Sequence, residues 1–179
     1  MIIRLAREID DIQACAAVDH SYVTNRVWQV DAREQPDGAS VAFRSVRLPR
    51  DMHGHYPRHL EGLNACWERG DAVLVAEGEG QIVGYIHLVV EASENSAWVR
   101  NLAVAPRLRR RGIGTALLHA AADWLRQQNA DRLLIETTTK NYPAIRFAQK
   151  LGFSFCGYND RYYANQDIAL FFAKSLRWS

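Results

Sequence analysis

A basic, glycine-containing turn at residues 109–115 is the segment of this sequence best suited to bind a ligand. Arg109, Arg110 and Arg111 run directly into Gly112-Ile113-Gly114, and an apolar stretch with helical periodicity follows. The start of a helix carries unpaired backbone N–H groups and the positive end of the helix dipole, and glycine lets the backbone approach a phosphate closely. The pattern therefore predicts that a diphosphate binds at the start of this helix.

Two common phosphate-binding motifs do not fit the spacing of this turn. The Walker loop requires GxxxxGK[ST], and dinucleotide-binding folds require GxGxxG in a parallel βαβ unit. A structural alternative is that the glycines only make a tight turn and the arginines form a solvated basic corner. A nucleic-acid surface is not expected, because 22 basic residues are balanced by 20 acidic ones and the arginines lack interleaved aromatic side chains. The sequence thus favours a diphosphate ligand of another kind.

The elements that position this turn follow from hydrophobic periodicity and turn residues. The predicted order is strand, helix, hairpin, helix, three strands, helix, strand, helix and two strands, a single domain over residues 1–179. An antiparallel meander that passes into a strand-helix-strand crossover indicates an α+β fold with helices on the faces of a sheet. The predicted ranges are 2–6, 8–20, the hairpin 27–34 with 40–48, 56–70, 71–78, 81–90, 96–104, 112–127, 132–139, 141–152, 153–158 and 166–176.

Composition limits the compartment and the partners. The net charge is +2, and the three cysteines, Cys15, Cys66 and Cys156, are odd in number and outside any CxxC spacing. Thiols of this kind indicate a reducing compartment, so a cytoplasmic protein is expected. The first residues lack the pattern of a signal peptide, and no apolar stretch approaches the roughly 20 residues that cross a bilayer. No membrane partner is expected.

The segment NLAVAPRLRRRGIGTALL, residues 101–118, resembles the acetyl-CoA signature of the GNAT N-acetyltransferase superfamily. A second segment in the right order, IETTTKNYPAIRFAQKLGF at residues 135–153, resembles the superfamily's later strand and its Asn-x-x-Ala-Ile helix. The resemblance covers residues 70–175, and residues 20–65 are the variable substrate-side segment. Within the superfamily, the C-terminal half is similar to streptothricin acetyltransferases and to ribosomal-protein-alanine N-acetyltransferases.

This resemblance implies a mixed, mostly antiparallel sheet in which two neighbouring strands splay apart at a cleft for acetyl-CoA, the co-substrate. It implies that backbone N–H groups from Arg110 to Thr115 bind the diphosphate, that an N–H near Val104 polarises the thioester carbonyl, and that Asn141 contacts the cofactor from the other strand. The implied cofactor-binding residues are Leu102, Ala103, Val104, Arg109, Arg110, Arg111, Gly112, Ile113, Gly114, Thr115 and Asn141.

The attacking amine must lose a proton, and the resemblance makes Glu136 the first candidate base because it ends an apolar strand beside the implied cleft. The alternative is that Glu136 orients substrate or pairs with an arginine. Glu91, Glu94 and Asn101, on or near neighbouring strands, are rival candidates.

The general acid that the resemblance implies for the leaving thiolate is missing from its usual position. Many relatives place a tyrosine at the position of Ala148 to protonate the leaving thiolate, and this chain has none there. A thiol pKa of about 8.5 makes the thiolate a tolerable leaving group without such an acid. Tyr163, or else Tyr162 or Tyr142, is the candidate replacement, with aromatic packing as the alternative role for each.

Two further groups lie in the substrate-side segment. His53, His55 and His59 invite a metal site, but no acidic or cysteine partner completes a known spacing, so no metal is predicted and a loop over the substrate cleft is favoured. The hairpin carries acidic residues that attract a cationic amine or only keep the hairpin soluble; these are Asp31, Glu34 and Asp37. Trp28, Phe43 and Tyr56 form an apolar wall there or belong to the core.

The sequence therefore predicts an acetyl-CoA-dependent N-acetyltransferase that acts on a primary amine by direct attack, with a small streptothricin-like cation as the first acceptor class. A protein or peptide amine is the second. A catalytically silent acetyl-CoA-binding module is a third hypothesis, because Ala148 replaces the tyrosine. A homodimer is compatible with the resemblance, although no sequence feature indicates an interface.

Overall fold

A seven-stranded mixed sheet forms the centre of the protein in the computed structural model, which describes residues 1–57 and 62–177. The strand order is β1-β4-β5-β6-β7-β9-β8, and every neighbouring pair is antiparallel except β6 with β7. The strands are β1 (Ile2–Leu5), β4 (Ala72–Gly78), β5 (Gln81–Glu91), β6 (Ser96–Val104), β7 (Arg132–Thr138), β8 (Ser154–Asn159) and β9 (Ala169–Ser175). This confirms the predicted α+β fold and its mostly antiparallel sheet.

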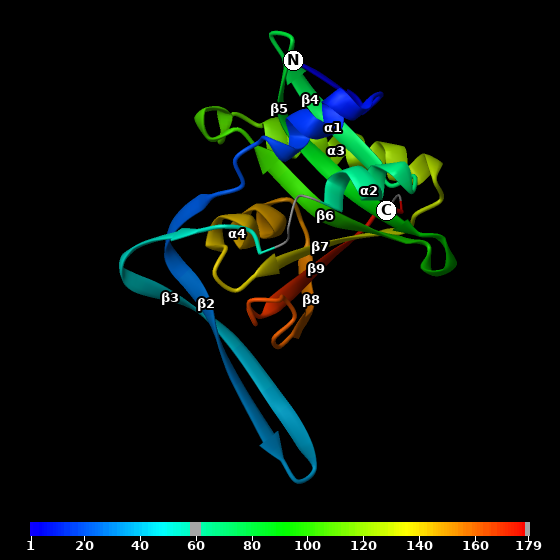
Figure 1. Cartoon of the computed structure of the whole chain (residues 1–179). Helices are drawn as coiled ribbons and strands as arrows, with labels where there is room; N and C mark the ends of the chain where they lie inside the picture. The colour runs from blue at the N-terminus through cyan, green and yellow to red at the C-terminus, as the bar shows by residue number, and fades with distance from the viewer. Residues whose placement is uncertain (58–61, 178–179) are drawn as a thin grey trace.

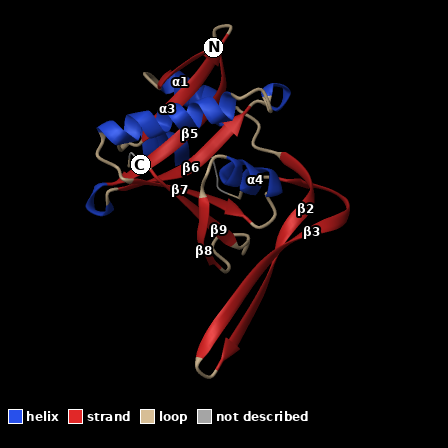
Figure 2. Ribbon diagram, turned by 180° about the vertical axis from the view of Figure 1, so that it is seen from behind, coloured by secondary structure: helices blue, strands red, loops and turns tan. Residues whose placement is uncertain are grey.

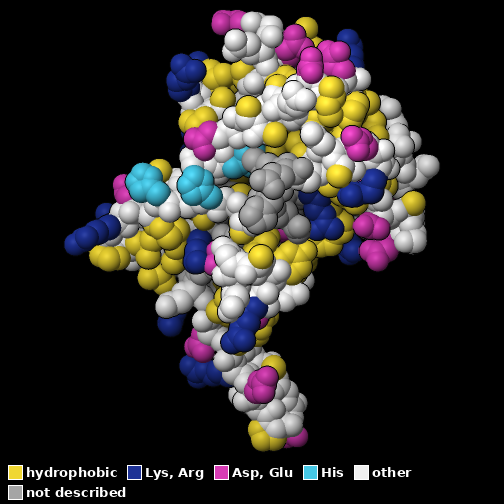
Figure 3. All heavy atoms as spheres, viewed as in Figure 1, with side chains coloured by type: hydrophobic (Ala, Val, Ile, Leu, Met, Phe, Trp, Pro, Cys, Tyr) yellow, Lys and Arg dark blue, Asp and Glu magenta, His cyan; other side chains and the backbone are white. Residues whose placement is uncertain are grey.

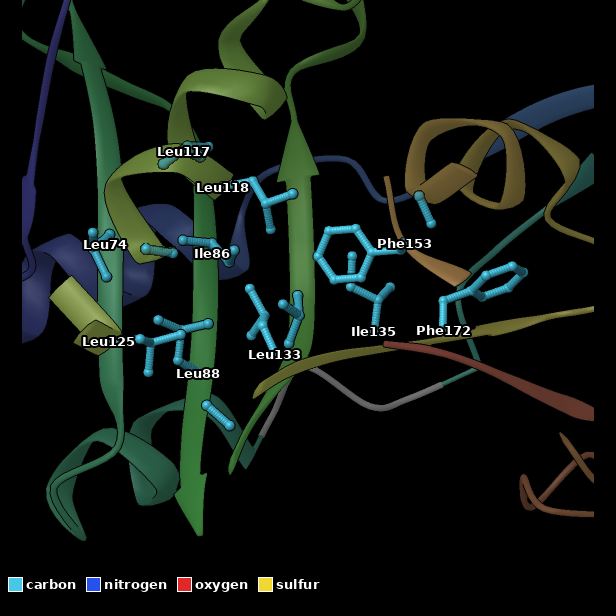
Figure 4. Packing of buried hydrophobic residues seen from close by; sticks show 14 of the residues in the cluster. Leu74, Ile86, Leu88, Leu117, Leu118, Leu125, Leu133, Ile135, Phe153 and Phe172 are labelled. Carbon is cyan, nitrogen blue, oxygen red and sulfur yellow. The ribbon is translucent and has the colours of Figure 1, made fainter. Parts of the chain in front are cut away.

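Helices cover both faces of this sheet. In Figure 1, α1 (Ile9–Ala16) and α2 (Leu63–Glu68) lie in front of it, and Figure 2 shows α3 (Ile113–Gln127) crossing its other face. The alternating side chains of β4, β5 and β6 serve two cores: Ile12, Leu63 and Tyr85 pack on the α1 side, and Leu117 and Ile86 on the α3 side. Figure 4 shows this second core continuing to Ile135, Phe153 and Phe172. α4 (Tyr142–Lys150) packs beside β7 and the second, smaller sheet.

The parallel pair β6–β7 separates halfway along its length. Ser96–Val99 pair with Arg132–Ile135, after which β6 continues along β5 to Val104 while β7 continues along β9 to Thr138. A register shift in the β5–β6 pairing makes Arg100 the extra residue of a bulge between Val99 and Asn101, where the strands begin to part. The splayed strand pair that the sequence predicted is therefore present.

A two-stranded arm extends from this body. β2 (Tyr22–Gln35) and β3 (Gly38–Gly54) form a hairpin around the turn Pro36-Asp37, longer than the predicted strands 27–34 and 40–48. Near its root, Trp28 and Phe43 contact Phe155, and Trp28 also contacts Phe172 of the core. Beyond these aromatic residues the arm projects from the body (Figures 1 and 2).

The helix predicted at 56–70 is the main correction to the element boundaries. The helical part is α2, Leu63–Glu68; Tyr56 is not helical, and residues 58–61 lie outside the described structure. Tyr56 instead directs its hydroxyl to the Arg100 carbonyl oxygen, 3.2 Å away, and to Glu136 Oε1, 3.1 Å away. A contact across the fold thus overrides the local helical pattern.

Candidate active site

A cleft of about 810 Å³ opens where β6 and β7 part, bounded also by the start of α3 and by α4. It contains ten of the eleven cofactor-binding residues expected from the sequence, with Arg111 not among the residues that line it. The ten are Leu102, Ala103, Val104, Arg109, Arg110, Gly112, Ile113, Gly114, Thr115 and Asn141.

The start of α3 provides an anion-binding geometry. Gly112 has φ of 86°, a left-handed conformation that glycine adopts without the strain of a Cβ atom, and the helix follows from Ile113 with no side-chain cap. Its first N–H groups thus stay available to an anion. α4 differs, because Asn141 Oδ1 accepts from the Ala144 N–H at 3.1 Å. Since capping occupies the Asn141 oxygen, its amide nitrogen is the atom suited to donate to a ligand.

The Arg109 side chain donates hydrogen bonds to three backbone carbonyl oxygens. Its Nε donates to the Val104 carbonyl oxygen at 2.7 Å, and its two terminal nitrogens each donate at 2.5 Å, to the carbonyl oxygens of Ser21 and Asp19. One guanidinium thereby fastens the segment after α1 to the end of β6. The first arginine of the basic turn therefore shapes the cleft wall, while Arg110 lines the cleft.

The unpaired half of β6 presents backbone groups to the cleft. The Ala105 N–H donates to the Val83 carbonyl oxygen of β5 at 2.8 Å. Backbone groups alternate sides along a strand, so the N–H groups of Leu102 and Val104 point away from β5, toward the gap left by β7. Donors so placed can bind the amide groups and the thioester carbonyl of an extended pantetheine chain.

Two orphaned polar atoms also fit a bound ligand. Within the described part of the chain, three buried side-chain atoms have no hydrogen-bond partner: Ser96 Oγ, Asn101 Oδ1 and Thr137 Oγ1. Asn101 and Thr137 both line the cleft, one from each of the parting strands. Buried polar atoms without partners are destabilising, so their concentration here indicates a ligand that completes their hydrogen bonds. The cleft thus suits a ligand rich in amide and amine groups, as acetyl-CoA and its acceptor are.

Glu136 lines this cleft, with its carboxylate fully buried and bound by four donors among the residues that the structure describes. Arg100 donates to Oε2 at 2.8 Å, and the hydroxyl of Tyr162 donates to the same oxygen at 3.2 Å. Tyr56 and Tyr163 each donate to Oε1 at 3.1 Å. A carboxylate offers about four lone pairs, so an amine reaches Glu136 by displacing a donor or through a hydroxyl. The arginine pairing that the sequence left as an alternative is present.

The candidate acids occupy different places. Tyr163 is 6% exposed and does not line the cleft, and burial, followed by the nearby Tyr56 and Glu136, raises the pKa of its hydroxyl. Tyr162 and Tyr142 also lie outside the lining residues. Ala148 is fully buried in the core, so this position contributes packing and no hydroxyl.

The structure separates the rival bases. Glu91 ends β5 and Glu94 lies in the turn before β6, at the end of the β5–β6 pairing opposite to the cleft. Asn101 lines the cleft. Of these rivals, only Asn101 is placed where it can contact an acceptor.

The loop predicted around the histidines falls partly outside the described residues, and its described part, residues 55–57, is neither helix nor strand and brings Tyr56 to the cleft. His53 is exposed and belongs to β3, where it pairs with Val23, while His55 is exposed just beyond that strand and His59 lies outside the described residues. The acidic residues of the hairpin, Asp31, Glu34 and Asp37, lie on the projecting arm and do not line the cleft. Figure 3 shows this arm as a narrow extension that carries both acidic and basic side chains.

One group of potential metal ligands occurs among the described residues, Cys66, Asp71 and His87. The Arg69 guanidinium donates to Cys66 Sγ at 3.2 Å and lies 3.9 Å from Asp71 Oδ2. A fixed positive charge against two of three ligands disfavours a cation, so this cluster gives no support to a metal centre.

The sequence did not predict a site role for Arg100, and it predicted Tyr56 only as part of an apolar wall or of the core. Both lie within a few ångströms of Glu136, from β6 and from the segment before α2. The opposite charges of Arg100 and Glu136 on adjacent strands were a readable signal, but the bulge that turns Arg100 toward Glu136 has no local signature. Tyr56 had no signal beyond its aromatic character.

Known proteins share this fold and these motifs. The family model described as the acetyltransferase (GNAT) family matches residues 41–153. Streptothricin acetyltransferase of Streptomyces lavendulae is 31% identical over 159 residues, covering 86% of this chain and 82% of its own. An N-alpha-acetyltransferase of Sulfurisphaera tokodaii is 34% identical over 148 residues, covering 76% of this chain and 85% of its own. A crystal structure of nourseothricin acetyltransferase superposes with a TM-score of 0.83 at 25% identity, covering 98% of each chain.

The chain belongs to the GNAT acetyltransferase family. It is an acetyl-CoA-dependent N-acetyltransferase, in agreement with the motifs at residues 101–118 and 135–153. None of the described helices is both long and apolar enough to cross a membrane.

Proposed function

We propose that the acceptor is a primary amine of a small, streptothricin-like cation. The observation that carries this proposal is the full-length likeness to nourseothricin acetyltransferase, which extends through the substrate-side residues 20–65 as well as the cofactor core. The cleft supports it, because Tyr22, Tyr56 and Glu136 offer aromatic faces and a carboxylate to an ammonium group.

The cofactor residues have the following proposed roles. N–H groups from Gly112 to Thr115 bind the diphosphate with Arg110 beside them, and those of Leu102 and Val104 bind the pantetheine chain. The Asn141 amide nitrogen donates from the β7 side. Thr137 Oγ1 is buried in the cleft without a described partner, and it forms a hydrogen bond with the pantetheine chain.

The acceptor loses its proton through Tyr56 to Glu136 in this proposal. Tyr56 alone of the three tyrosines on Glu136 lines the cleft, so its hydroxyl oxygen can accept the amine proton while its own proton passes to Oε1. The new C–N bond forms as the C–S bond breaks, and the leaving group departs as a thiolate. Tyr163, behind the carboxylate, holds Glu136 in place.

A thiol-release assay with acetyl-CoA tests the acceptor class. The panel contains streptothricin, an aminoglycoside, a polyamine and short peptides with a free N-terminus, and the acetylated product is identified by mass. Release with streptothricin and not with peptides supports the proposal. Release with peptides alone refutes it, and acetyl-CoA binding without release on any amine points to an acceptor outside these classes.

A peptide or protein N-terminus is the second candidate. The similarity to the archaeal N-alpha-acetyltransferase, 34% over 76% of this chain, favours it. An α-amine has a pKa of about 7.7 to 8.0, so a large neutral fraction exists near neutral pH and less proton transfer is required. The same panel separates the two classes.

We infer a reducing, cytoplasmic compartment from the three free cysteines, Cys15, Cys66 and Cys156. A homodimer remains an expectation from the resemblance, and sedimentation of the purified protein tests it.

A further inference from the structure

A chain of side chains leads from the edge of the α2 region into the cleft. Asp71 Oδ2 lies 3.0 Å from His87 Nε2, and His87 Nδ1 lies 3.4 Å from Asn101 Nδ2. His87 on β5 and Asn101 on β6 are directly paired residues, so their side chains share one face of the sheet. Because His87 is 3% exposed, solvent has little access to the middle of this chain.

The protonation of His87 determines which way the Asn101 amide points. Burial lowers the pKa of His87 more than its hydrogen bond to Asp71 raises it, so the imidazole is neutral near neutral pH and carries one N–H. The Asp71 carboxylate only accepts hydrogen bonds, which places that hydrogen on Nε2. Nδ1 is then an acceptor, and the Asn101 group facing it must be the amide nitrogen.

The amide oxygen of Asn101 is consequently fixed on the other side. It is buried and has no hydrogen-bond partner among the residues that the structure describes, while Asn101 lines the cleft. The neighbouring bulge residue, Arg100, directs its guanidinium to Glu136. An acceptor oxygen is thus held in the same cleft as the carboxylate and the Tyr56 hydroxyl that the proposed function assigns to the amine.

We infer that Asn101 Oδ1 accepts a hydrogen bond from the attacking primary amine, and that His87 and Asp71 are positioning residues that hold the amide in this orientation. The inference rests on the proposed function of the cleft. A neutral primary amine has two N–H bonds and one lone pair. Holding one N–H on Asn101 and the other on Tyr56 aims the lone pair at the thioester carbon.

Asn101→Leu tests this role, because leucine has a similar size and no polar atom. We expect kcat with an accepted amine to fall about 10- to 100-fold, since one orienting hydrogen bond is lost. The affinity for acetyl-CoA by calorimetry should stay within about twofold. Resistance to urea should fall slightly, because leucine removes the orphaned oxygen but also the donor to His87 Nδ1.

Ser96→Ala is the matched control. Ser96 Oγ is another orphaned atom on β6, but Ser96 does not line the cleft. This variant should leave kcat unchanged. Equal losses of kcat in the Ser96 and Asn101 variants would mean that the effect of Asn101→Leu is structural.

The positioning role is tested at Asp71, whose side chain is 17% exposed and so tolerates substitution better than His87. Asp71→Asn should lower kcat in the wild-type background and have no further effect in the Asn101→Leu background. Additive losses would overturn the positioning role.

Two results overturn the role of Asn101. Unchanged kcat in Asn101→Leu would show that Oδ1 does not hold the amine. Weaker acetyl-CoA binding with unchanged kcat at saturation would show that Oδ1 accepts its hydrogen bond from the pantetheine chain instead. Failure of the proposed function is a separate result, in which the wild-type protein itself releases thiol with no amine of the panel; the inference then falls with it.

Discussion

At the scale of single residues, Glu136 is defined by its donors. In the described part of the chain, three tyrosine hydroxyls and Arg100 hold one fully buried carboxylate. These donors occupy the lone pairs of the carboxylate, so an amine has no open oxygen to contact directly. A hydroxyl that relays the proton, or a donor displaced by the amine, gives the amine access to this carboxylate.

Tyr56→Phe distinguishes the relay from a structural contact. We expect kcat to fall about 10- to 100-fold, because general acid-base catalysis through one group contributes on that order or more. Tyr162→Phe removes a comparable hydrogen bond to Glu136 from a tyrosine outside the cleft lining, and should lower kcat less. Steady-state kinetics with a saturating amine measure both. Equal losses in the two variants would rule out a special role for Tyr56.

Residue-scale prediction from sequence worked where a motif fixes the backbone. Gly112 and Asn141 occur in recognisable segments, and the structure places both at the cleft. It was weaker for Arg100, Tyr56 and Asn101, whose positions depend on a bulge and on pairing between strands. The orientation of the Asn101 amide depends on the protonation of His87, which no sequence pattern encodes.

At the scale of elements, the start of α3 combines a left-handed glycine with uncapped N–H groups. The turn chemistry and the helix periodicity are both local, so the sequence predicted this element well. The helix expected at 56–70 was wrong in extent, because Tyr56 is held by contacts to β6 and β7.

Gly112→Asp should weaken acetyl-CoA binding by at least about tenfold, since it places a negative charge where the helix start attracts an anion. Gly112→Ala is the control, because alanine has the same strain at φ of 86° and no charge. Calorimetry measures both affinities. If the two variants bind acetyl-CoA equally, charge at this position is irrelevant and the diphosphate lies elsewhere.

The junction of β1, α1 and β4 gives an acid-stability prediction. Arg4 donates to both oxygens of Asp11 and to Glu77, and the hydrogen bond from Arg4 is the main cause that lowers the pKa of Asp11 to about 2. A carboxyl with a depressed folded-state pKa contributes stability above its unfolded value, and this is lost as pH falls through the folded value.

The free energy of unfolding should therefore drop by about 1 to 2 kcal/mol between roughly pH 4 and pH 2 on account of Asp11. Asp11→Asn should remove this part of the pH dependence and lower stability at pH 7. Urea unfolding across this range measures it. An unchanged slope in the variant would show that other carboxyl groups dominate.

At the scale of the whole molecule, the cofactor cleft and the arm are distinct parts. The fold class of the body and the order of its elements along the chain followed from local patterns, because each element buries one face. The projection of the arm did not, since alternating residues in a hairpin look the same whether or not a neighbour covers them. All residues from Ala32 to Ala42 are exposed, whereas Trp28 and Phe43 are half-buried against the core.

The arm should therefore divide into a root that stabilises the body and a tip that does not. Ala32 and Val41 are directly paired, so an Asn-Gly turn can join them in place of residues 33–40. This shortened chain should keep its thermal stability and acetyl-CoA affinity, because none of the removed residues lines the cleft. Trp28→Ala should lower stability by about 2 to 3 kcal/mol, less than for a fully buried tryptophan.

Thermal unfolding and thiol release, measured on the shortened chain and on the Trp28→Ala variant, test whether the arm divides into a stabilising root and a dispensable tip. A shortened chain that unfolds earlier would show that the tip supports the body. A shortened chain of normal stability that loses activity on streptothricin but keeps acetyl-CoA binding would show that the tip reaches the acceptor, either in the same chain or in a second copy. Unchanged activity would confine amine selection to residues that line the cleft, among them Tyr56 and Asn101, which make the proposed hydrogen bonds to the amine.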